Sequence, residues 1–269
     1  MTGPYEWREA PESDYAVIGD PIAHSLSPKM HGAAFEALGL ELRYVAVRVP
    51  SGEVSLALGH LADLGYKGVN VTVPHKEEAL EWSNEADGLS RRARAANTLD
   101  LGKRGAINTD GPGFLDTLAG LDLPAGSKAV ILGAGGSARA IALAVAESGF
   151  RVSLWNRTRD RAERFVCESG LDAELLDLPA AQGAALIVNA TAAGFEGEAP
   201  ELDWSGTPEN ALAYDLSYGD GPSPFLRKAS ERGLRTADGL NLLVAQGARA
   251  LEWWLGLKAP REAMLRALR

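Results

Sequence analysis

The feature that most constrains the fold is an apolar run that passes directly into a cluster of glycines and then into an alanine-rich segment. Residues 128–132 predict a buried strand and residues 137–148 predict a helix, with a glycine turn between them. Glycines in such a turn let the backbone approach a pyrophosphate, and the first turn of the helix offers free N–H groups. An ordinary tight turn would use the same glycines, but the strand before it and the helix after it favour a dinucleotide-binding unit. The residues expected to contact the cofactor here are Gly133, Ala134, Gly135, Gly136, Ser137 and Ala138.

The end of the next predicted strand, residues 151–155, indicates which dinucleotide binds. An NAD site usually has Asp or Glu at this point to bond the ribose 2′-OH, whereas this chain has Asn156, followed by Arg157 and Thr158. Arg157 and Arg161 are four residues apart, so they can bracket one anion from a loop and a first helical turn. Both arginines could instead be ordinary surface residues. With no carboxylate at Asn156, the pattern favours NADP, whose 2′-phosphate is such an anion, over NAD.

Strand and helix patterns alternate along most of the chain, which predicts an α/β fold with parallel sheets and helices on both faces. A change of pattern near residue 110 divides the chain into a first α/β domain, residues 1–109, and a dinucleotide-type domain, residues 110–239. Residues 240–255 predict one long helix, in which the adjacent Trp253 and Trp254 cannot share a face. The other predicted strands are 15–18, 44–47, 68–73, 97–101, 105–108, 185–189 and 211–215, and the other predicted helices are 29–38, 51–64 (capped by Ser51), 76–85 and 159–169.

Composition and charge exclude several classes of partner. The net charge of −9 and the isoelectric point of about 5.1 argue against nucleic acid and anionic membranes, which both need a basic face. The single cysteine, Cys167, allows no internal disulfide and is expected to be a small packing residue, and the polar first 14 residues are no signal peptide. We therefore expect a cytoplasmic protein, with monomer or homodimer left open. The four histidines have no metal-ligand spacing, so no metal site is expected.

Small polar residues cluster at the predicted loops of the first domain. Ser25 and Ser27 alternate, so in an extended stretch both hydroxyls would face the same way and suit a carboxylate, although Ser27 before Pro28 could also cap a helix. Thr72 lies on the polar face of the predicted strand 68–73, and Lys76 comes just after the end of this strand, where α/β active sites collect.

Residues 96–98 and 108–111 are two further polar segments of the first domain. Together with the stretches above they match the pattern of a known family. The chain resembles shikimate dehydrogenases over essentially its whole length. The resemblance is carried by the ordered series of residues 19–28, 70–76, 96–98, 108–111, 133–138, 156–158, 189–191, 215–218 and 238–246. It implies a substrate-binding α/β domain, completed by the C-terminal helix in residues 240–269, and a Rossmann-like NADP-binding domain with an active-site cleft between the two.

The resemblance also implies the activity, which is the NADPH-dependent, reversible reduction of 3-dehydroshikimate to shikimate on the route to chorismate and aromatic amino acids. Lys76 and Asp110 match the catalytic pair; we expect Lys76 to be the acid/base and Asp110 its orienting partner, although the reverse is open. The substrate-binding residues that it implies are Ser25, Ser27, Thr72, Lys76, Asn97, Asp110, Tyr218 and Gln246, and Thr191 and Gly239 are added to the cofactor site.

Three other hypotheses fit parts of the sequence. An NAD-dependent quinate/shikimate dehydrogenase conflicts with residues 156–158, although quinate as a secondary substrate stays open. An enzyme like glutamyl-tRNA reductase would need a nucleophilic cysteine in the first domain, where there is none. A sensor that binds shikimate or NADP without turnover could have lost Lys76 or Asp110, but this chain has both.

Overall fold

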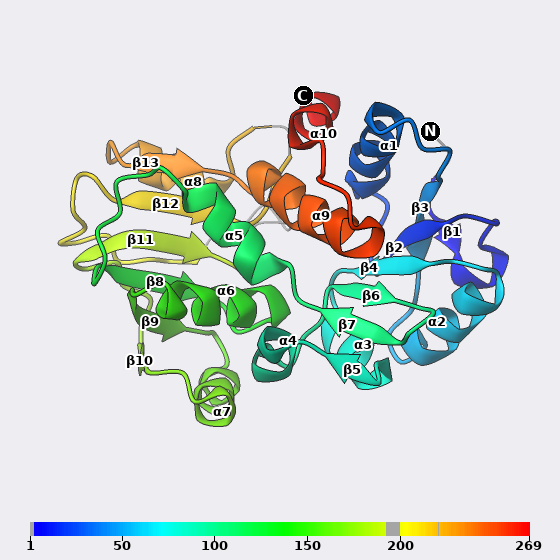
Figure 1. Ribbon diagram of the computed structural model, residues 1–269. Helices are drawn as coiled ribbons and strands as arrows, with labels where there is room; N and C mark the ends of the chain where they lie inside the picture. The colour runs from blue at the N-terminus through cyan, green and yellow to red at the C-terminus, as the bar shows by residue number, and fades with distance from the viewer. Residues whose placement is uncertain (1–2, 192–199, 220) are drawn as a thin grey trace. The chain divides into compact units, whose positions relative to one another are not determined.

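The computed structural model describes residues 3–191, 200–219 and 221–269 and divides the chain into two compact units. The first unit comprises residues 1–109 and 243–269, and the second comprises residues 110–242. Each unit is built on its own sheet with helices against it (Figure 1). The predicted α/β class is confirmed.

The sheet of the first unit is mixed, with strand order β1-β3-β2-β4-β6-β7-β5. Its first four strands run parallel, whereas β6 is antiparallel to both of its neighbours because β6 and β7 form the predicted hairpin. The strands are β1 (Tyr5–Glu6), β2 (Tyr15–Gly19), β3 (Tyr44–Arg48), β4 (Gly68–Val71), β5 (Glu85–Ala86), β6 (Thr98–Asp100) and β7 (Gly105–Ile107).

The helices of this unit differ in detail from the prediction. α2 begins at Val54 with Glu53 at its N-cap, so the predicted capping by Ser51 is wrong; Ser51 lies in the preceding turn. β4 ends at Val71, short of the predicted Val73, because the chain turns between Thr72 and His75, where the N–H of His75 donates to the Thr72 carbonyl. The helices are η1 (Trp7–Glu9), α1 (Ser27–Ala37), α2 (Val54–Asp63), α3 (Lys76–Trp82), α4 (Gly88–Ala93), α9 (Leu240–Leu255, from residue 243 onward) and α10 (Arg261–Leu268).

The two adjacent tryptophans of α9 have different environments. The indole of Trp254 stacks on Tyr15 at 4.7 Å between ring centroids and donates to the carbonyl of Leu99 at 3.0 Å. The side chain of Trp253 is 39% exposed. Trp254, which is half-buried, therefore fixes α9 against the sheet of the first unit, and the two adjacent indoles lie on different faces of the helix.

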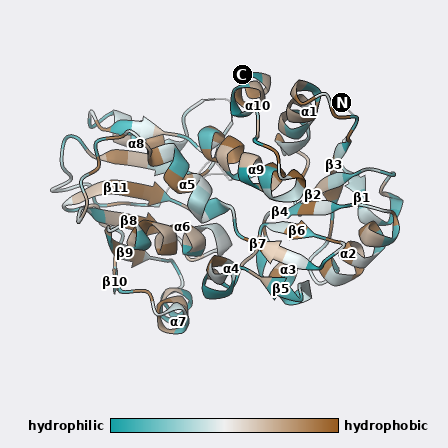
Figure 2. Cartoon of the chain, in the orientation of Figure 1, coloured by the Kyte–Doolittle hydropathy of each residue, from teal (hydrophilic) through white to brown (hydrophobic). Residues whose placement is uncertain are grey.

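The second unit has a six-stranded, wholly parallel sheet with order β10-β9-β8-β11-β12-β13, in which chain order reverses between β8 and β11. This is the strand order of a dinucleotide-binding Rossmann fold, whose ligands bind where the order reverses. The central strands are almost continuously apolar, as Figure 2 shows for β11, because helices cover both faces. The strands are β8 (Lys128–Leu132), β9 (Arg151–Trp155), β10 (Ala173–Leu175), β11 (Ala184–Asn189), β12 (Leu212–Asp215) and β13 (Arg235–Ala237). The helices are α5 (Asp110–Leu118), α6 (Gly136–Glu147), α7 (Arg159–Ser169) and α8 (Pro224–Ser230).

Two further findings complete the fold. In the described part of the chain, no helix has both the length and the apolar character that a membrane span requires.

Cys167 on α7 is exposed, so its expected role as a packing residue is wrong: α7 buries Ala162 and Phe165 instead.

Candidate active site

The serine loop precedes α1 and is not extended. Leu26 has helical backbone angles (φ −83°, ψ −4°), so the predicted alternation of two hydroxyls along an extended stretch is wrong. The hydroxyl of Ser25 accepts the backbone N–H of Ser27 at 3.3 Å, and Ser27 is already the first residue of the helix. Ser25, rather than Ser27, therefore satisfies an N–H at the start of the helix.

A buried hydrogen-bond network connects α1 to the centre of the first sheet. The ring of His31 on α1 stacks on that of Tyr44 at 4.3 Å between centroids, and the phenol of Tyr44 donates to Oδ1 of Asn70 at 2.8 Å. Burial holds the pKa of Tyr44 well above its ordinary value, partly offset by the hydroxyl of Ser27, so the phenol keeps its proton. Asn70 donates in turn to the carbonyl of Asn97 at 3.1 Å and to Thr98 at 3.0 Å.

Asn97 is the junction of this network. Its Oδ1 accepts the backbone N–H of Thr109 at 2.7 Å, and its Nδ2 donates to Gln246 on α9 at 3.4 Å. Gln246 also donates from Nε2 to the carbonyl of Leu243, which fixes the orientation of its amide. Side chains 149 positions apart in the chain thus meet within one unit.

Lys76 is the first residue of α3 and is only 8% exposed. The backbone carbonyl of Lys76 accepts the N–H of Ala96 at 2.9 Å, which places Lys76 close to Asn97, the next residue in the chain after Ala96. The ring of His75 is buried and donates from Nε2 to the carbonyl of Val49 at 2.6 Å, which anchors the start of α3. Thr72 is half-buried between the end of β4 and this turn.

Asp110, Tyr218 and Gly239 belong to the second unit. Asp110 begins α5, is 6% exposed and directly follows Thr109, whose backbone is bonded to Asn97. Tyr218 is half-buried in the loop after β12. Gly239 donates its N–H to the carbonyl of Ser217 at 2.9 Å, beside Tyr218 in the chain.

The glycine loop has the geometry of a phosphate-binding turn. Gly133 has φ of +116°, a conformation that favours glycine, and a Cβ there would lie 2.9 Å from the carbonyl oxygen of Ala190. Gly135 is the N-cap of α6 without any side-chain cap, so N–H groups of the first turn (Gly136, Ser137 and Ala138) can meet an anion.

The loop after β9 presents two uncommitted arginines. Within the described residues, the guanidinium groups of Arg157 and Arg161 are exposed and have no acidic partner. Arg159 between them is held by Glu163 and Asp177. Asn156 donates to the carbonyl of Thr158 at 2.7 Å, which fixes the turn between the two arginines. The two arginines can therefore bind a phosphate group beside the C-terminal end of β9.

A second buried network lies at the ends of β11 and β12. The carboxylate of Asp215 accepts from Asn189 at 3.0 Å, from Ser217 at 2.8 Å and from Ser223 at 2.6 Å. Asn189 accepts the hydroxyl of Thr191 at 2.7 Å. Thr191, predicted to contact the cofactor, is thereby fixed beside the glycine loop, since the N–H of the preceding Ala190 donates to Leu132.

Comparison with known proteins decides the family. A sequence profile for the shikimate dehydrogenase substrate-binding domain matches residues 17–99, and one for the shikimate 5′-dehydrogenase C-terminal domain matches residues 239–269. A shikimate dehydrogenase (NADP(+)) from Hyphomonas neptunium is 41% identical over 249 residues, covering 90% of this chain and 91% of that protein. The chain belongs to the shikimate dehydrogenase family.

Solved structures extend the comparison to the fold. The shikimate 5-dehydrogenase of Thermus thermophilus, in complex with NADP(H) and shikimate, superposes with a TM-score of 0.86 at 40% identity, covering 94% of this chain and 97% of that one. A ligand-free 5-ketofructose reductase of a Gluconobacter species has a TM-score of 0.83 at 28% identity, covering 98% of each chain. Enzymes named for different substrates thus share the architecture of the shikimate dehydrogenase family.

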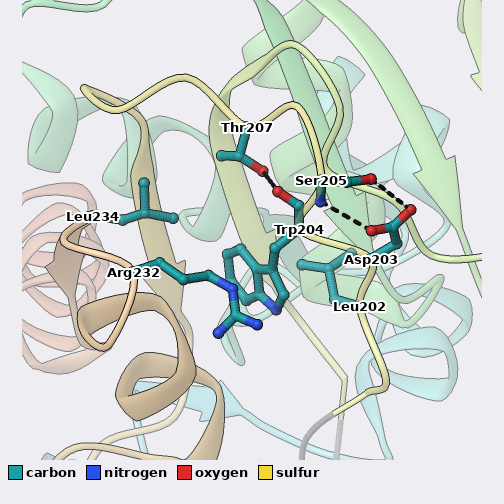
Figure 3. Close-up of a pocket in the computed structure, with 7 residues that line it drawn as sticks. All are labelled: Leu202, Asp203, Trp204, Ser205, Thr207, Arg232 and Leu234. Atoms are coloured by element: carbon teal, nitrogen blue, oxygen red, sulfur yellow. Dashed lines mark hydrogen bonds between the residues drawn. The ribbon is translucent and has the colours of Figure 1, made fainter.

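The second unit also has a surface pocket of about 390 Å³ (Figure 3). The guanidinium of Arg232 lies 5.6 Å from the ring centroid of Trp204, while Ser205 is bonded to Asp203. The described residues that line this pocket are Leu202, Asp203, Trp204, Ser205, Thr207, Arg232 and Leu234. None of them is a predicted site residue.

Three residues that connect the site were not predicted from the sequence. Tyr44, Thr109 and Asp215 are not among the predicted site residues, yet each bonds directly to a residue of the two networks. The signal for Asp215 was available, because a polar residue ending an apolar strand is typical of α/β sites. Tyr44 gave no signal, because an aromatic residue at the start of a strand usually indicates only packing.

His31 gives the first unit a defined sensitivity to acid. Its ring is fully buried, stacks on Tyr44 and packs near Phe35 and Trp254, and burial lowers its pKa to about 3 from 6.5. The unfolded chain therefore binds this proton more readily than the folded one, so stability falls as pH drops below about 6.5 and continues to fall until about 3. Between pH 7 and pH 5 we expect this residue alone to cost about 2 kcal/mol in the free energy of unfolding.

Urea unfolding of His31→Gln at both pH values measures this contribution. The variant should lose less stability than the wild type between pH 7 and pH 5, by about the same 2 kcal/mol. His24→Gln, at an exposed histidine of the same unit, should keep the wild-type difference. An unchanged pH dependence in His31→Gln would contradict the assignment.

Proposed function

We propose that this member of the family catalyses the NADPH-dependent, reversible reduction of 3-dehydroshikimate to shikimate in aromatic amino acid biosynthesis. The observation that carries the proposal is the likeness, over 94% of the chain, to the Thermus thermophilus enzyme whose structure contains NADP(H) and shikimate. The presence of Lys76 and Asp110, both nearly buried, favours an enzyme over a binding protein without turnover.

The first unit is proposed as the substrate-binding domain. Ser25 and Ser27 would donate to the substrate carboxylate, joined by Tyr218 from the second unit. Thr72, Asn97 and Gln246 would bond the ring hydroxyls. The bonds of Asn97 with Gln246 and Thr109 support this role, because they fix the orientation of the Asn97 amide. A site that bonds a substrate hydroxyl through a fixed amide rejects an analogue that lacks this hydroxyl, because the analogue leaves the buried amide unpaired.

Catalysis is proposed to depend on Lys76 and Asp110. Bound NADPH would supply the hydride to the ketone carbon. The Lys76 ammonium would donate its proton to the ketone oxygen as negative charge develops there, and the neutral amine would accept a proton from the shikimate hydroxyl in the reverse direction. Asp110 would bond the same hydroxyl and orient Lys76.

The second unit is proposed as the NADP-binding domain. The pyrophosphate would lie against the N–H groups at the start of α6, and Arg157, Arg161, Asn156 and Thr158 would hold the 2′-phosphate. Thr191 and Gly239 would contact the nicotinamide end. We further propose a cytoplasmic location and a monomer or homodimer, with no metal, nucleic acid or membrane in its function.

The assay follows the absorbance of reduced nicotinamide with purified protein and shikimate, using NADP or NAD. Reduction of NADP in strong preference to NAD is expected. Reduction of NAD alone would overturn the cofactor assignment, and no reduction of either, with shikimate still bound in calorimetry, would favour a sensor.

The proposed 2′-phosphate site at Arg157 and Arg161 predicts that replacing either arginine weakens the binding of NADP more than that of NAD. Replacing Arg157 or Arg161 with Ala should raise the KM for NADP about 10- to 100-fold, because a hydrogen bond to a charged group contributes about 1.5–3 kcal/mol. The KM for NAD should change little. Arg151→Ala removes an exposed arginine from the other end of β9 and should leave both values near wild type. An equal loss with NADP and NAD would contradict the 2′-phosphate role.

A further inference from the structure

The carboxylate of Asp215 is the centre of the network at the ends of β11 and β12. Asn189 and Asp215 end these two parallel strands as register partners and are 0% and 1% exposed. In the described part of the chain, Oδ1 of Asp215 accepts both the backbone N–H and the hydroxyl of Ser217. Oδ2 accepts from Nδ2 of Asn189 and from the hydroxyl of Ser223. These donors match the lone-pair sites that a carboxylate offers.

The orientation of the Asn189 amide follows from its backbone partner. Oδ1 of Asn189 accepts the backbone N–H of Thr191 at 3.2 Å, and an N–H can only donate. Nδ2 of Asn189 must therefore face Asp215, whose Oδ2 lies 3.0 Å away. The hydroxyl of Thr191 donates to the same Oδ1 of Asn189 at 2.7 Å. Asp215 and Thr191 thus hold the two ends of one buried amide in a single orientation.

The segment that this amide holds packs directly on the glycine loop. The N–H of Ala190 donates to the carbonyl of Leu132 at 2.9 Å. A Cβ on Gly133 would lie 2.9 Å from the carbonyl oxygen of Ala190 and 3.4 Å from the backbone nitrogen of Thr191. A shift of Thr191 therefore changes the surroundings of the loop at which the cofactor is proposed to bind.

We propose that Asp215 is a positioning residue for NADP, which acts through Asn189 on Thr191 and does not touch the cofactor. This inference rests on the proposed function. A buried amide N–H without an acceptor is destabilised, so without the carboxylate the segment of Asn189 and Thr191 moves to find another partner. Cofactor binding then has to order this segment again, which weakens the affinity.

The first test is Asp215→Asn, which keeps the size of the side chain. The backbone N–H of Ser217 holds the remaining oxygen on its side, so the new NH2 group faces Nδ2 of Asn189, donor against donor. The hydroxyl of Ser223 can reverse and accept, so the bonds on the side of Tyr218 persist. We expect the Kd for NADP, measured by calorimetry, to rise about ten-fold, while the KM for shikimate stays near wild type.

Ser223→Ala is the matched control. It removes a different donor to the same oxygen of Asp215 and leaves the bond from Asn189 in place. The start of α8 loses its cap, because the hydroxyl of Ser223 also accepts the N–H of Leu226, so the melting temperature should fall. The Kd for NADP should stay near wild type. An equal rise of this Kd in both variants would contradict a specific path through Asn189.

An exchange of the two side chains shows whether their hydrogen bond carries the effect. Asn189→Asp alone sets two carboxylates against each other and should also weaken NADP binding. Combined with Asp215→Asn, the amide at position 215 donates to the carboxylate at position 189, whose other oxygen still accepts from Thr191. The double variant should therefore bind NADP almost as tightly as wild type, whereas additive losses would overturn the inference.

Asn189→Ala tests the same link if either exchanged variant fails to fold, because it removes the amide without setting like groups against each other. It should raise the Kd for NADP about five-fold. An unchanged Kd in this variant or in Asp215→Asn would overturn the inference. Wild-type protein that binds NADP but oxidises no shikimate would instead overturn the proposed function. The two failures are distinguishable, because calorimetry of NADP binding needs no turnover.

Discussion

Lys76→Met is expected to lower kcat for shikimate oxidation by about 100- to 10,000-fold, the range that general acid–base catalysis contributes. Methionine has a similar length and no proton to donate or accept, so it fills the space of a side chain that is 8% exposed. The start of α3 should persist, since its anchor is the bond from His75 to Val49 and not the lysine. Steady-state kinetics with NADP and shikimate measure the effect.

Lys103→Met is the control for this variant. Lys103 lies in the exposed turn between β6 and β7 of the same unit, and its removal should leave kcat unchanged. Equal melting temperatures for the two variants would show that the loss in Lys76→Met is chemical. A near-normal turnover number in Lys76→Met would mean that the acid/base lies elsewhere. Asp110, the alternative proton-transfer residue, would then be tested first.

Gly239→Ala is expected to have the second large effect, a loss of about 3 kcal/mol or more in the free energy of unfolding of the second unit. A Cβ at this position would overlap the carbonyl oxygen of Leu216 and press on that of Ser217 at 3.1 Å. These are backbone atoms that no rotamer change can move. The N–H of Gly239 also donates to Ser217, so a shift of either segment breaks this bond. Denaturant unfolding and NADP binding should both report the change.

Gly219→Ala is the matched substitution for comparison. Among the described residues, none has an atom within 4 Å of a Cβ at Gly219, on the same stretch after β12, so we expect a change within about 0.5 kcal/mol. Wild-type stability in Gly239→Ala would show that the Leu216 segment can move away, and the tight packing at this position would then have no energetic consequence.

The central elements of the second unit were predicted closely, although β10, β13, α5 and α8 were not predicted. Its strands are short apolar runs and its turns are marked by glycine, so local pattern alone placed β8, α6 and β9 within a residue or two. Errors arose where local chemistry had two solutions. Ser51 and Ser27 both have good capping side chains, yet α2 starts three residues after Ser51, and the hydroxyl of Ser25 accepts the N–H of Ser27.

The sequence by itself determined the α/β class, the strand–glycine–helix turn and the polar residues that end the strands, because each depends on neighbours within a few positions. Only the tertiary structure decided that Asn97 meets Gln246, that Asn189 meets Asp215 and that Tyr44 bonds Asn70. These pairs join segments that are distant in sequence, and no local periodicity encodes which of several polar side chains will pair. The order in which strands lie side by side brings these side chains together, and that order is a property of the folded sheet.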